Sequence, residues 1–266
     1  MKKTIITLMA LSGVAGAASV DCSMYEELGV SENLLGAYDF SSSSATKGTL
    51  NYSESFTVEN GVAVLGEGKN CPWANYMNLG PDWTISFDVL SLGSTNDAWS
   101  NILTMYSNTD NVGGGYKHSM VIGLDNQHQV QVSSSNGEET SFNGGEAVNM
   151  KTGIYDDGAT GNVAKANGQT ITLVQDSSAN TLTLYVDGVQ TQQATGWDPA
   201  SIVGMQFGKG FAYGRDPLED ATIDNLAIWN TALSKDMVES LIVPEPATAT
   251  LSLLALAGLA ARRRRK

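Results

Sequence analysis

Cysteine, histidine and proline are all scarce in this chain. It has two cysteines, two histidines and six prolines in 266 residues. Zinc sites need clustered cysteine and histidine ligands, and these four residues are scattered. A Ser-His-Asp nucleophile is equally unsupported, because no Gly-x-Ser-x-Gly elbow accompanies His118 or His128. We therefore expect neither zinc chemistry nor a catalytic triad.

Basic residues are also rare outside the two ends of the chain. Of fifteen Lys and Arg residues, seven are Lys2, Lys3 and the run 262–266. The other eight stand against twenty-eight acidic residues, so the chain without those seven basic residues carries a net charge of −20. Nucleic acids and anionic membranes are recognised by clusters of Lys and Arg. Neither is an expected partner of the mature protein, whereas extracellular divalent cations and neutral glycans suit this charge.

The N-terminus has the three parts of a cleavable secretion signal. Lys2 and Lys3 are basic, residues 5–11 are mostly apolar, and residues 15–18 are small. The apolar part is much shorter than the roughly 20 residues of a membrane-spanning helix. We expect signal peptidase to remove residues 1–18 by cutting after Ala17 or Ala18. An uncleaved N-terminal anchor is the alternative.

The two cysteines are expected to form a disulfide. Val20 and Asp21 precede Cys22 at positions where a lipoprotein signal needs a small residue, so Cys22 is not a predicted lipid anchor. In an exported protein, Cys22 and Cys71 most simply pair with each other. With 48 residues between them, loop-closure entropy gives this bridge about 4 kcal/mol of stabilisation.

The C-terminal segment, residues 243–266, has three parts in a fixed order. Residues 247–261 carry no charge. An uncharged stretch of this length is marginal for spanning a bilayer of about 30 Å. The basic residues after it are expected to stay in the cytoplasm. The segment resembles a PEP-CTERM sorting signal in Pro244, Glu245, Pro246 and in Arg262, Arg263, Arg264, Arg265 and Lys266. The resemblance implies that an exosortase-type sorting enzyme of a Gram-negative-type bacterium cuts near the Pro-Glu-Pro. The protein would then reach the outer surface, the envelope or the exopolysaccharide matrix. An ordinary membrane tail anchor is the alternative.

The middle of the chain has the pattern of an all-β domain. Short alternating runs are separated by glycine and asparagine, and their number, on the order of twelve, is enough for two packed sheets. Asp187-Gly188 predicts a tight turn, and residues 138–166 predict a long loop or a loosely formed hairpin. One domain is expected over residues 19–242, because neither repeats nor a second composition occur. The clearest predicted strands are residues 84–89, 127–133, 169–174 and 181–186.

One helix is predicted near the end of this domain. Ser234 is its expected N-cap and Asp236 lies in its first turn. Pro244 cannot continue the helix and ends it. The predicted buried stripe is Met237, Val238, Leu241 and Ile242.

Four segments together resemble a known family. Residues 35–40, 83–87, 184–189 and 221–234 stand in the order and spacing of concanavalin A-like, laminin G-like (LamG) domains. The resemblance implies a jelly-roll sandwich with a short helix after the last strand. It implies binding of a glycan or protein ligand more often than catalysis. Residues 169–172 lack the Trp or His that the family often has there, which indicates a divergent branch.

The same resemblance implies a structural Ca²⁺ ion. Sandwich lectins of this kind often hold calcium with one aspartate near the first strand and another on the last strand. Asp39 and Asp224 occupy those places, and carboxylates are suitable ligands for this hard cation. The alternative is that Asp39 caps a turn, and that Asp224 with Asn225 satisfies backbone groups at a strand edge.

Glycan binding requires exposed aromatic rings beside polar side chains. Trp83 and Trp229 lie in predicted strands and are expected in the core. The loop aromatics could instead pack locally. The candidate ligand-binding residues, in segments rich in Gly, Asn and Asp, are Trp73, Trp99, Trp197, Phe211, Tyr213 and Arg215.

The carboxylate pattern does not predict an enzyme. Glycoside hydrolases use two carboxylates that face each other across a cleft, and the Glu-x-Asp-x-x-Glu pattern of sandwich hydrolases is missing. The adjacent pairs Glu138-Glu139 and Asp156-Asp157 would face opposite sides of a strand. Asp216, Glu219 and Asp220 lie in a predicted loop. We expect a noncatalytic surface-binding protein, with a structural matrix component or a divergent polysaccharide-acting enzyme as alternatives.

Overall fold

The computed structural model divides the chain into two compact units. One comprises residues 19–243, and the other comprises residues 1–18 and 244–266. Every described residue belongs to the first unit, and no helix in the described ranges is long and apolar enough to cross a membrane. The structure describes residues 25–26, 29–43, 56–66, 69, 73–75, 79–93, 100–106, 119–125, 129–134, 148–155, 168–195, 204–208 and 218–242.

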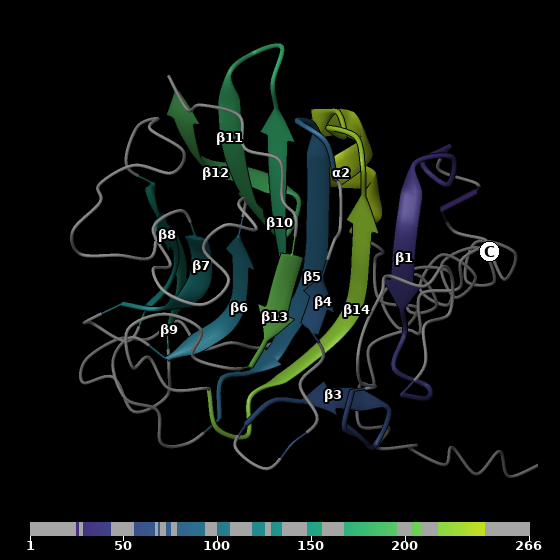
Figure 1. Cartoon of the computed structure of the whole chain (residues 1–266), viewed down its shortest axis with the longest axis vertical. Coiled ribbons are helices and arrows are strands. Elements are labelled where there is room, and N and C mark those ends of the chain that lie inside the picture. Colours follow the sequence, from purple (N-terminus) through teal and green to yellow (C-terminus); the bar gives the residue numbers. More distant parts are fainter. Residues whose placement is uncertain are drawn as a thin grey trace, which may run out of the picture. The chain divides into compact units, whose positions relative to one another are not determined.

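The first layer is an eight-stranded antiparallel sheet (Figure 1). Its strands are ordered β12-β11-β10-β5-β14-β3-β2, and β1 pairs with β14 off this path. The strands are β1 (Leu34–Tyr38), β2 (Val58–Glu59), β3 (Val62–Val64), β5 (Trp83–Ser91), β10 (Gln169–Asp176), β11 (Thr181–Val186), β12 (Val189–Thr195) and β14 (Thr222–Trp229).

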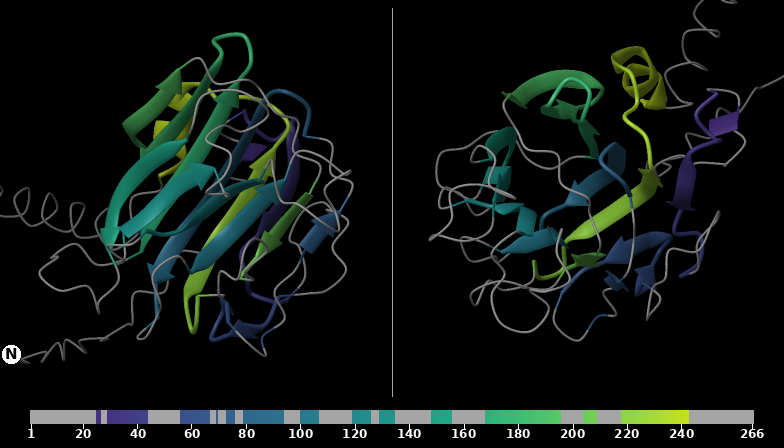
Figure 2. Two further views of the ribbon diagram at one scale, coloured as in Figure 1. Left: turned by 60° about the vertical axis from the view of Figure 1, so that its left-hand side comes forward. Right: turned by 45° about the horizontal axis from the view of Figure 1, so that its top comes forward.

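The second layer is a six-stranded antiparallel sheet in the order β4-β13-β6-β7-β8-β9. Figure 2 shows its strands as a layer apart from those of the first sheet. The all-β two-sheet sandwich expected from the sequence is therefore confirmed. The strands are β4 (Trp73–Asn75), β6 (Asn101–Tyr106), β7 (Ser119–Leu124), β8 (Gln129–Ser134), β9 (Asn149–Tyr155) and β13 (Gly204–Phe207).

The core lies between the two sheets and follows from the alternation of side chains along each strand. In β5, Trp83, Ile85 and Phe87 are fully buried and face the other sheet. In β8, Val130 and Val132 do the same from the opposite layer. Each fully buried side chain of this size stabilises the fold by about 1.5–3 kcal/mol.

The outer face of the eight-stranded sheet carries a second, smaller apolar cluster. Helix α2 (Lys235–Leu241) packs on this face through Val238, which contacts the cluster around Trp229. The indole Nε1 of Trp229 donates a hydrogen bond to the carbonyl of Val30 at 2.9 Å. The ring of Tyr25 meets Trp229 edge-on at 5.4 Å. The helix and the N-terminal residues thus cover part of this face.

Several local expectations are confirmed. Strands β10 and β11 form the predicted antiparallel hairpin. Asp187 and Gly188 both have positive φ angles, 50° and 72°, as the tight turn between β11 and β12 requires. Ser234 is the N-cap of α2, and its side chain accepts a hydrogen bond from the backbone of Met237. Trp83 and Trp229 are fully buried.

Two expectations are wrong, and a third is met only in one of its alternatives. Residues 149–155 lie in a stretch predicted as a long loop or a loosely formed hairpin, and they form strand β9, because Met150 and Ile154 reach the core despite weak alternation. Met237 is 37% exposed, because among the helix residues only Val238 is buried against the sheet. Trp73 lies in β4 and not in a loop, since that segment pairs with β13.

Candidate functional site

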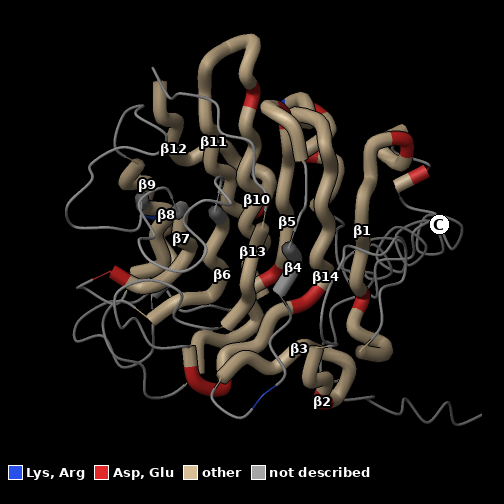
Figure 3. The backbone as a smooth tube through the Cα atoms, in the orientation of Figure 1, with Lys and Arg blue, Asp and Glu red and all other residues tan. Residues whose placement is uncertain are grey.

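The two predicted calcium ligands are brought together on the outer face of the eight-stranded sheet. Asp39 directly follows β1, Asp224 lies on β14, and these two strands are paired. The negative charge of Asp39 contributes to raising the pKa of Asp224. The pairing of β1 with β14 thus brings together two aspartates that are 185 positions apart in the sequence. Acidic positions along the described backbone are red in Figure 3, where basic positions are few.

A bulge in β14 places a third carboxylate beside Asp224. Asp224 stands opposite Asp88 of β5, but Ala227 stands opposite Ser86, so β14 has one extra residue between these pairs. Asn225 occupies the bulge with a φ of 50°. Its side-chain amide donates to Asp88 Oδ2 at 2.6 Å, and its backbone N–H donates to Asp224 Oδ1 at 2.8 Å. Asn225 therefore holds the two carboxylates next to each other.

Asp88 is held from its other side by β10. The hydroxyl of Thr170 donates to Asp88 Oδ1 at 2.5 Å, and the backbone N–H of Thr170 donates to Asp187 Oδ1 at 2.9 Å. Burial raises the pKa of Asp88 above its ordinary value, and the charge of Asp187 adds to this, while the bonds from Thr170 and Asn225 oppose it. Both oxygens of Asp88 are thus engaged. We call Asp39, Asp88, Asp187 and Asp224 the acidic cluster.

Asp224 is the most perturbed member of the acidic cluster. It is only 3% exposed, and its burial, with the charges of Asp88 and Asp39, raises its pKa to about 7. The hydrogen bond from Asn225 works in the opposite direction. Such concentrated negative charge suits a hard cation with oxygen ligands. Within the described ranges, however, no group of three or more Asp, Glu, His or Cys side chains is arranged to hold a metal.

The two aspartates also make the backbone hydrogen bonds expected if Asp39 caps a turn and Asp224 satisfies backbone groups at a strand edge. Asp39 Oδ1 accepts from the backbone N–H of Ser41 at 3.0 Å and from its hydroxyl at 2.9 Å, which is a local turn. Asp224 accepts from the backbone of its own neighbour, Asn225. Both aspartates therefore stabilise the backbone whether or not a cation binds.

Sequence reasoning missed Asp88, Thr170, Asn225 and Asp187. One signal was available for Asp88, because it lies at an outward position of a regular alternating strand, where a charge is unusual in a central strand. The pairing of β5 with β14 could not be read from the sequence. Glu219 and Asp220, predicted as loop charges, lie in the turn before β14 as expected.

A second candidate site lies on the outer face of the six-stranded sheet. Since Val130 and Val132 of β8 face the core, Gln129, Gln131 and Ser133 point to the outer side. These three polar side chains are nevertheless 6%, 5% and 8% exposed. Uncharged hydrogen-bonding groups with so little contact with bulk water are unusual on an outer sheet face.

The strand register continues this polar row across the sheet. Ser133 stands opposite Val121 of β7, which stands opposite Thr104 of β6. Thr104 in turn stands opposite Gln206 of β13, and Gln206 stands opposite Trp73 of β4. The backbone of Trp73, a predicted ligand-binding residue, is thus in register with this row. We call Asn101, Thr104, Gln129, Gln131, Ser133 and Gln206 the polar band.

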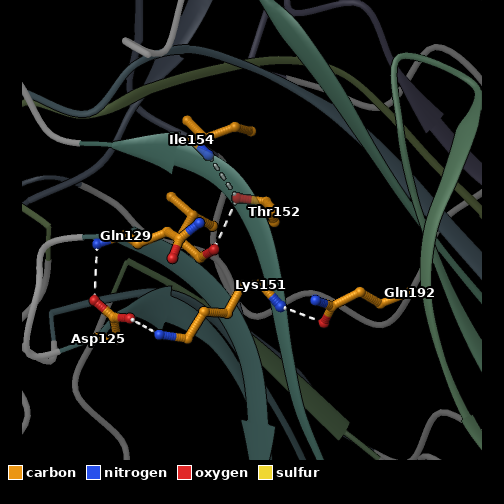
Figure 4. A network of polar contacts seen from close by, with 7 residues as sticks. Asp125, Gln129, Lys151, Thr152, Ile154 and Gln192 are labelled. Carbon is orange, nitrogen blue, oxygen red and sulfur yellow. Dashed lines mark hydrogen bonds and ion pairs between the residues drawn. The ribbon is translucent and has the colours of Figure 1, made fainter. Parts of the chain in front are cut away.

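An ion pair borders the polar band at β9 (Figure 4). Lys151 Nζ lies 3.0 Å from Asp125 Oδ2, and Asp125 Oδ1 accepts from the backbone N–H of Gln129 at 2.9 Å. The backbone N–H of Lys151 donates to the side chain of Gln192 on β12 at 2.7 Å. Because Asp125 neutralises Lys151, this end of the band carries no net charge.

The polar band contains both a tightly packed glycine and a hydroxyl without a hydrogen-bond partner. A side chain at Gly123 would lie 2.5 Å from the carbonyl of Ser100 and 3.0 Å from the amide oxygen of Asn101, so only glycine fits there. The amide of Asn101 donates to Thr104 at 3.5 Å. The hydroxyl of Ser133 is buried without a hydrogen-bond partner. A buried hydroxyl of this kind needs a water or a ligand group to satisfy it.

Most other predicted site residues lie outside the described residues. This applies to Cys22 and Cys71, to both histidines and Asp216, and to the two end segments with the sorting residues. Only the backbone position of Trp73 is described among the aromatic candidates. The ligand-binding candidates outside the described residues are Trp99, Trp197, Phe211, Tyr213 and Arg215.

The comparison with protein families identifies the sorting signal at the C-terminus. Residues 243–266 match the PEP-CTERM protein-sorting motif. The C-terminal segment is a PEP-CTERM sorting signal. This motif marks an exported protein that an exosortase processes and that is sorted to the cell surface. The expectation for Pro244, Glu245, Pro246 and the arginine run is confirmed.

Solved structures identify the fold of the domain. Domain 4 of AbnA, an extracellular arabinanase from Geobacillus stearothermophilus in complex with arabinotriose, is 14% identical with a TM-score of 0.51 over 79% of this chain and 98% of that one. The receptor-binding domain of botulinum neurotoxin C/D mosaic serotype is 11% identical with a TM-score of 0.55, over 79% and 51%. Trypanosoma rangeli sialidase is 13% identical with a TM-score of 0.51, over 79% and 32%.

At such low identities these similarities establish the two-sheet β-sandwich fold and nothing about ligands. No curated protein matches the sequence of this chain. The chain is thus an exosortase-sorted surface protein with a two-sheet β-sandwich domain.

Proposed function

We propose that the domain is a noncatalytic carbohydrate-binding module displayed on the cell surface. The observation that carries this proposal is the polar band, which includes the unsatisfied hydroxyl of Ser133. The LamG-like membership inferred from the sequence and the sorting signal agree with this role. An exported protein in an exopolysaccharide layer is surrounded by sugars.

The chemistry of the polar band suits a neutral sugar. Amides such as Gln131 donate and accept hydrogen bonds, as hydroxyl groups of sugars also do. The only charges described at the band, Lys151 and Asp125, are paired with each other. Neutral hydrogen bonds contribute about 0.5–1.5 kcal/mol each, so several of them together give the modest affinity of a surface lectin.

The acidic cluster is proposed to hold a structural Ca²⁺ ion, with Asp39 and Asp224 as ligands. The buried charge of Asp224 and the nearby charge of Asp39 support this assignment. A bound cation would remove the mutual repulsion that raises the pKa of Asp224. Calcium would fasten β1 to β14, and it would do so on the sheet face opposite to the polar band.

The facing pair Asp88 and Asp224 does not favour a hydrolase. Two catalytic carboxylates need at least one oxygen each that is free to meet the substrate or a water. Both oxygens of Asp88 already accept hydrogen bonds, from Thr170 and Asn225. The pair therefore fits a structural role better than acid-base catalysis.

A glycan array tests the proposal. A fragment of residues 20–243 is screened in calcium and then in a chelator, beside the Ser133→Ala and Gln131→Ala variants. We expect reproducible binding by the wild-type fragment and about fivefold weaker binding by each variant, because one hydrogen bond is lost. Gln190→Ala is the matched control, since Gln190 is an exposed amide on the other sheet.

The loop aromatics are tested in the same screen. Loss of binding in the Trp197→Ala or Tyr213→Ala variant would add these residues to the site. A blank array from a well-folded fragment would contradict the proposal and favour the structural matrix role instead. Release of arabinan- or other polysaccharide-derived sugars by the fragment would favour the enzyme alternative.

A further inference from the structure

Strand β12 forms an open end of the eight-stranded sheet. It pairs with β11 on one side, and no described strand pairs with its other side. Six of its seven residues are exposed, and Ala194 is half-buried. Outside the ladder with β11, the described part of the chain offers the backbone of β12 no hydrogen-bond partner. The strand therefore presents a row of unpaired N–H and C=O groups.

The other described sheet ends are protected against a further strand. Strands β2 and β4 have two and three residues, and β1, which pairs with β14, is mostly buried. Strand β9 carries Lys151, and Gly153 with a φ of 81° interrupts its regular backbone. Short strands, lysines and irregular backbone are the means by which natural sheet edges avoid pairing. Strand β12 has seven residues and contains neither lysine nor proline.

The second half of β12 is the part that a further strand can extend. The register with β11 shifts once near the start of β12, and from Gln192 to Thr195 the pairing is regular. Ala194 packs against the core between the sheets, so its neighbours Gln193 and Thr195 point to the outer face. This regular stretch offers both an open backbone edge and two exposed, uncharged side chains.

The absence of charge distinguishes this edge from most of the acidic chain. Strands β11 and β12 contain no Asp, Glu, Lys or Arg, and Figure 3 draws both in the tan of uncharged residues. The chain without its seven terminal basic residues has a net charge of −20, so two copies repel each other over much of their surface. Two β12 edges meet without like charges directly opposite each other, which would destabilise a strand pair.

We propose that β12 pairs antiparallel with the β12 of a second copy of this chain, along Gln192 to Thr195. An antiparallel pair of identical strands has two-fold symmetry, so each copy satisfies the open edge of the other. The second β12 is already extended and held by β11, and its pairing loses less conformational entropy than the binding of a disordered peptide. One strand pair is a small interface, and the dimer is weak and concentration-dependent.

Charge-swapped variants test both the surface and its occupant. Gln193 and Thr195 are replaced together, by Lys in one variant and by Glu in another, and each mature protein is purified from the native host. In sedimentation equilibrium, the wild type should dimerise as its concentration rises. Each variant alone should dimerise about tenfold or more weakly, because like charges then face each other. A one-to-one mixture of the two variants should regain the association, because opposite charges then meet.

The matched control places the same two charges far from β12. Asn33 and Asn230 are exposed amides directly before β1 and directly after β14, and β11, β10 and β5 lie between β14 and β12. The Asn33→Lys and Asn230→Lys double variant changes the net charge by the same amount as the Lys variant of β12. It should dimerise like the wild type.

Amide hydrogen exchange of the unmodified protein gives an independent measurement. Between a dilute and a concentrated sample, exchange should slow in β12 and stay unchanged in β2, β4 and β9. The proposal is overturned by a protein that stays monomeric at every concentration, by charge variants that dimerise like the wild type, or by protection confined to other strands. If the mixture of folded Lys and Glu variants stays monomeric, the occupant is not a second β12 and the proposal also fails.

The dimer does not depend on the proposed glycan-binding function. Sedimentation and exchange are measured without any sugar, so a blank glycan array leaves their outcome unchanged. Conversely, a monomeric protein that binds a glycan would overturn the β12 pairing and leave the polar band as the proposed binding site.

Discussion

The two outer faces of the sandwich differ although they share one core. The face of the eight-stranded sheet holds the acidic cluster and, beyond it, the apolar cluster that α2 and Tyr25 cover. The face of the six-stranded sheet holds the uncharged polar band, bordered by the neutral pair of Lys151 and Asp125. One face joins distant parts of the chain to the sheet, and the other holds uncharged polar groups, among which the Ser133 hydroxyl has no hydrogen-bond partner.

Because of this difference, we expect substitutions on the face of the eight-stranded sheet to change stability and substitutions in the polar band to change ligand binding. Side chains such as Trp229 and Asp88 are engaged by other parts of the domain, so their loss changes the fold. Ser133 lacks a hydrogen-bond partner, so its loss is expected to change ligand binding more than folding. Helix α2 also packs on the eight-stranded sheet. The polar band lies on the opposite layer.

The largest effect is expected from Trp229→Ala. The change removes a fully buried indole, its hydrogen bond to Val30 and its contact with Tyr25. Loss of a buried Trp costs about 3–5 kcal/mol of unfolding free energy. Urea unfolding of the domain fragment measures this loss. A cost below about 1 kcal/mol would show that the apolar cluster does not hold α2 to the sheet.

The next effect concerns Asp224 and depends on pH. Its pKa is about 7 in the folded protein and near 3.8 in the unfolded chain. The folded state therefore binds more protons between these values, and stability falls as the pH rises from about 4 to about 7. In chelator at pH 8, Asp224→Asn should be more stable than wild type by about 1–3 kcal/mol, and equal to it below pH 4.

In calcium at pH 8, we expect the wild-type fragment to be more stable than Asp224→Asn, the opposite of the order in chelator. A cation bound by Asp39 and Asp224 stabilises only the folded wild-type protein and leaves Asp224→Asn unchanged. Melting temperatures at pH 8, with calcium and with chelator, check both parts. Equal melting temperatures in the two buffers for the wild-type fragment would contradict the cation assignment.

Asp125→Ala should have a smaller effect on the six-stranded sheet. The variant leaves the backbone N–H of Gln129 without its acceptor, and leaves Lys151, which is 39% exposed, to be hydrated by water. The expected cost is about 1–2 kcal/mol. Asp125→Asn is the control, because its amide oxygen can still accept from Gln129. If both variants unfold alike, the hydrogen bond is not the source of the effect.

The smallest effect on stability is expected from Gln131→Ala, about 0.5–1 kcal/mol because the side chain is buried but uncharged. The urea midpoint of the variant should fall only slightly below that of the wild type, while glycan binding weakens. A large loss of stability with unchanged binding would make the polar band a structural feature. That result would remove the distinction between the two faces.

Much of the fold could be predicted because its signals are local. The alternation in β5 and β8, the Asp187-Gly188 turn and the Ser234 cap each act over a few residues. Strand β9 could be predicted only as part of a loop or a loosely formed hairpin, because its register is irregular. Gly153 has a φ of 81°, and the pairing with β8 shifts between Gln129 and Gln131.

The candidate sites were harder to predict because they depend on pairing between distant strands. Asp39 and Asp224 were found through a family resemblance, but Asp88 joins them only because β5 lies beside β14. The outward direction of Gln131 and Ser133 follows from alternation, whereas their burial does not. The bulge at Asn225 depends on both neighbours of β14 and has no local sequence signal.

The most direct test of the central claim is amide chemical-shift mapping of the domain fragment with the glycan that binds best on the array. The account predicts shifts concentrated in β6, β7, β8 and β9, around Thr104, Gln131 and Ser133, with β10, β11 and β14 unchanged. Shifts confined to the acidic cluster side, or no shifts with any glycan, would contradict the assignment of the polar band as the binding site.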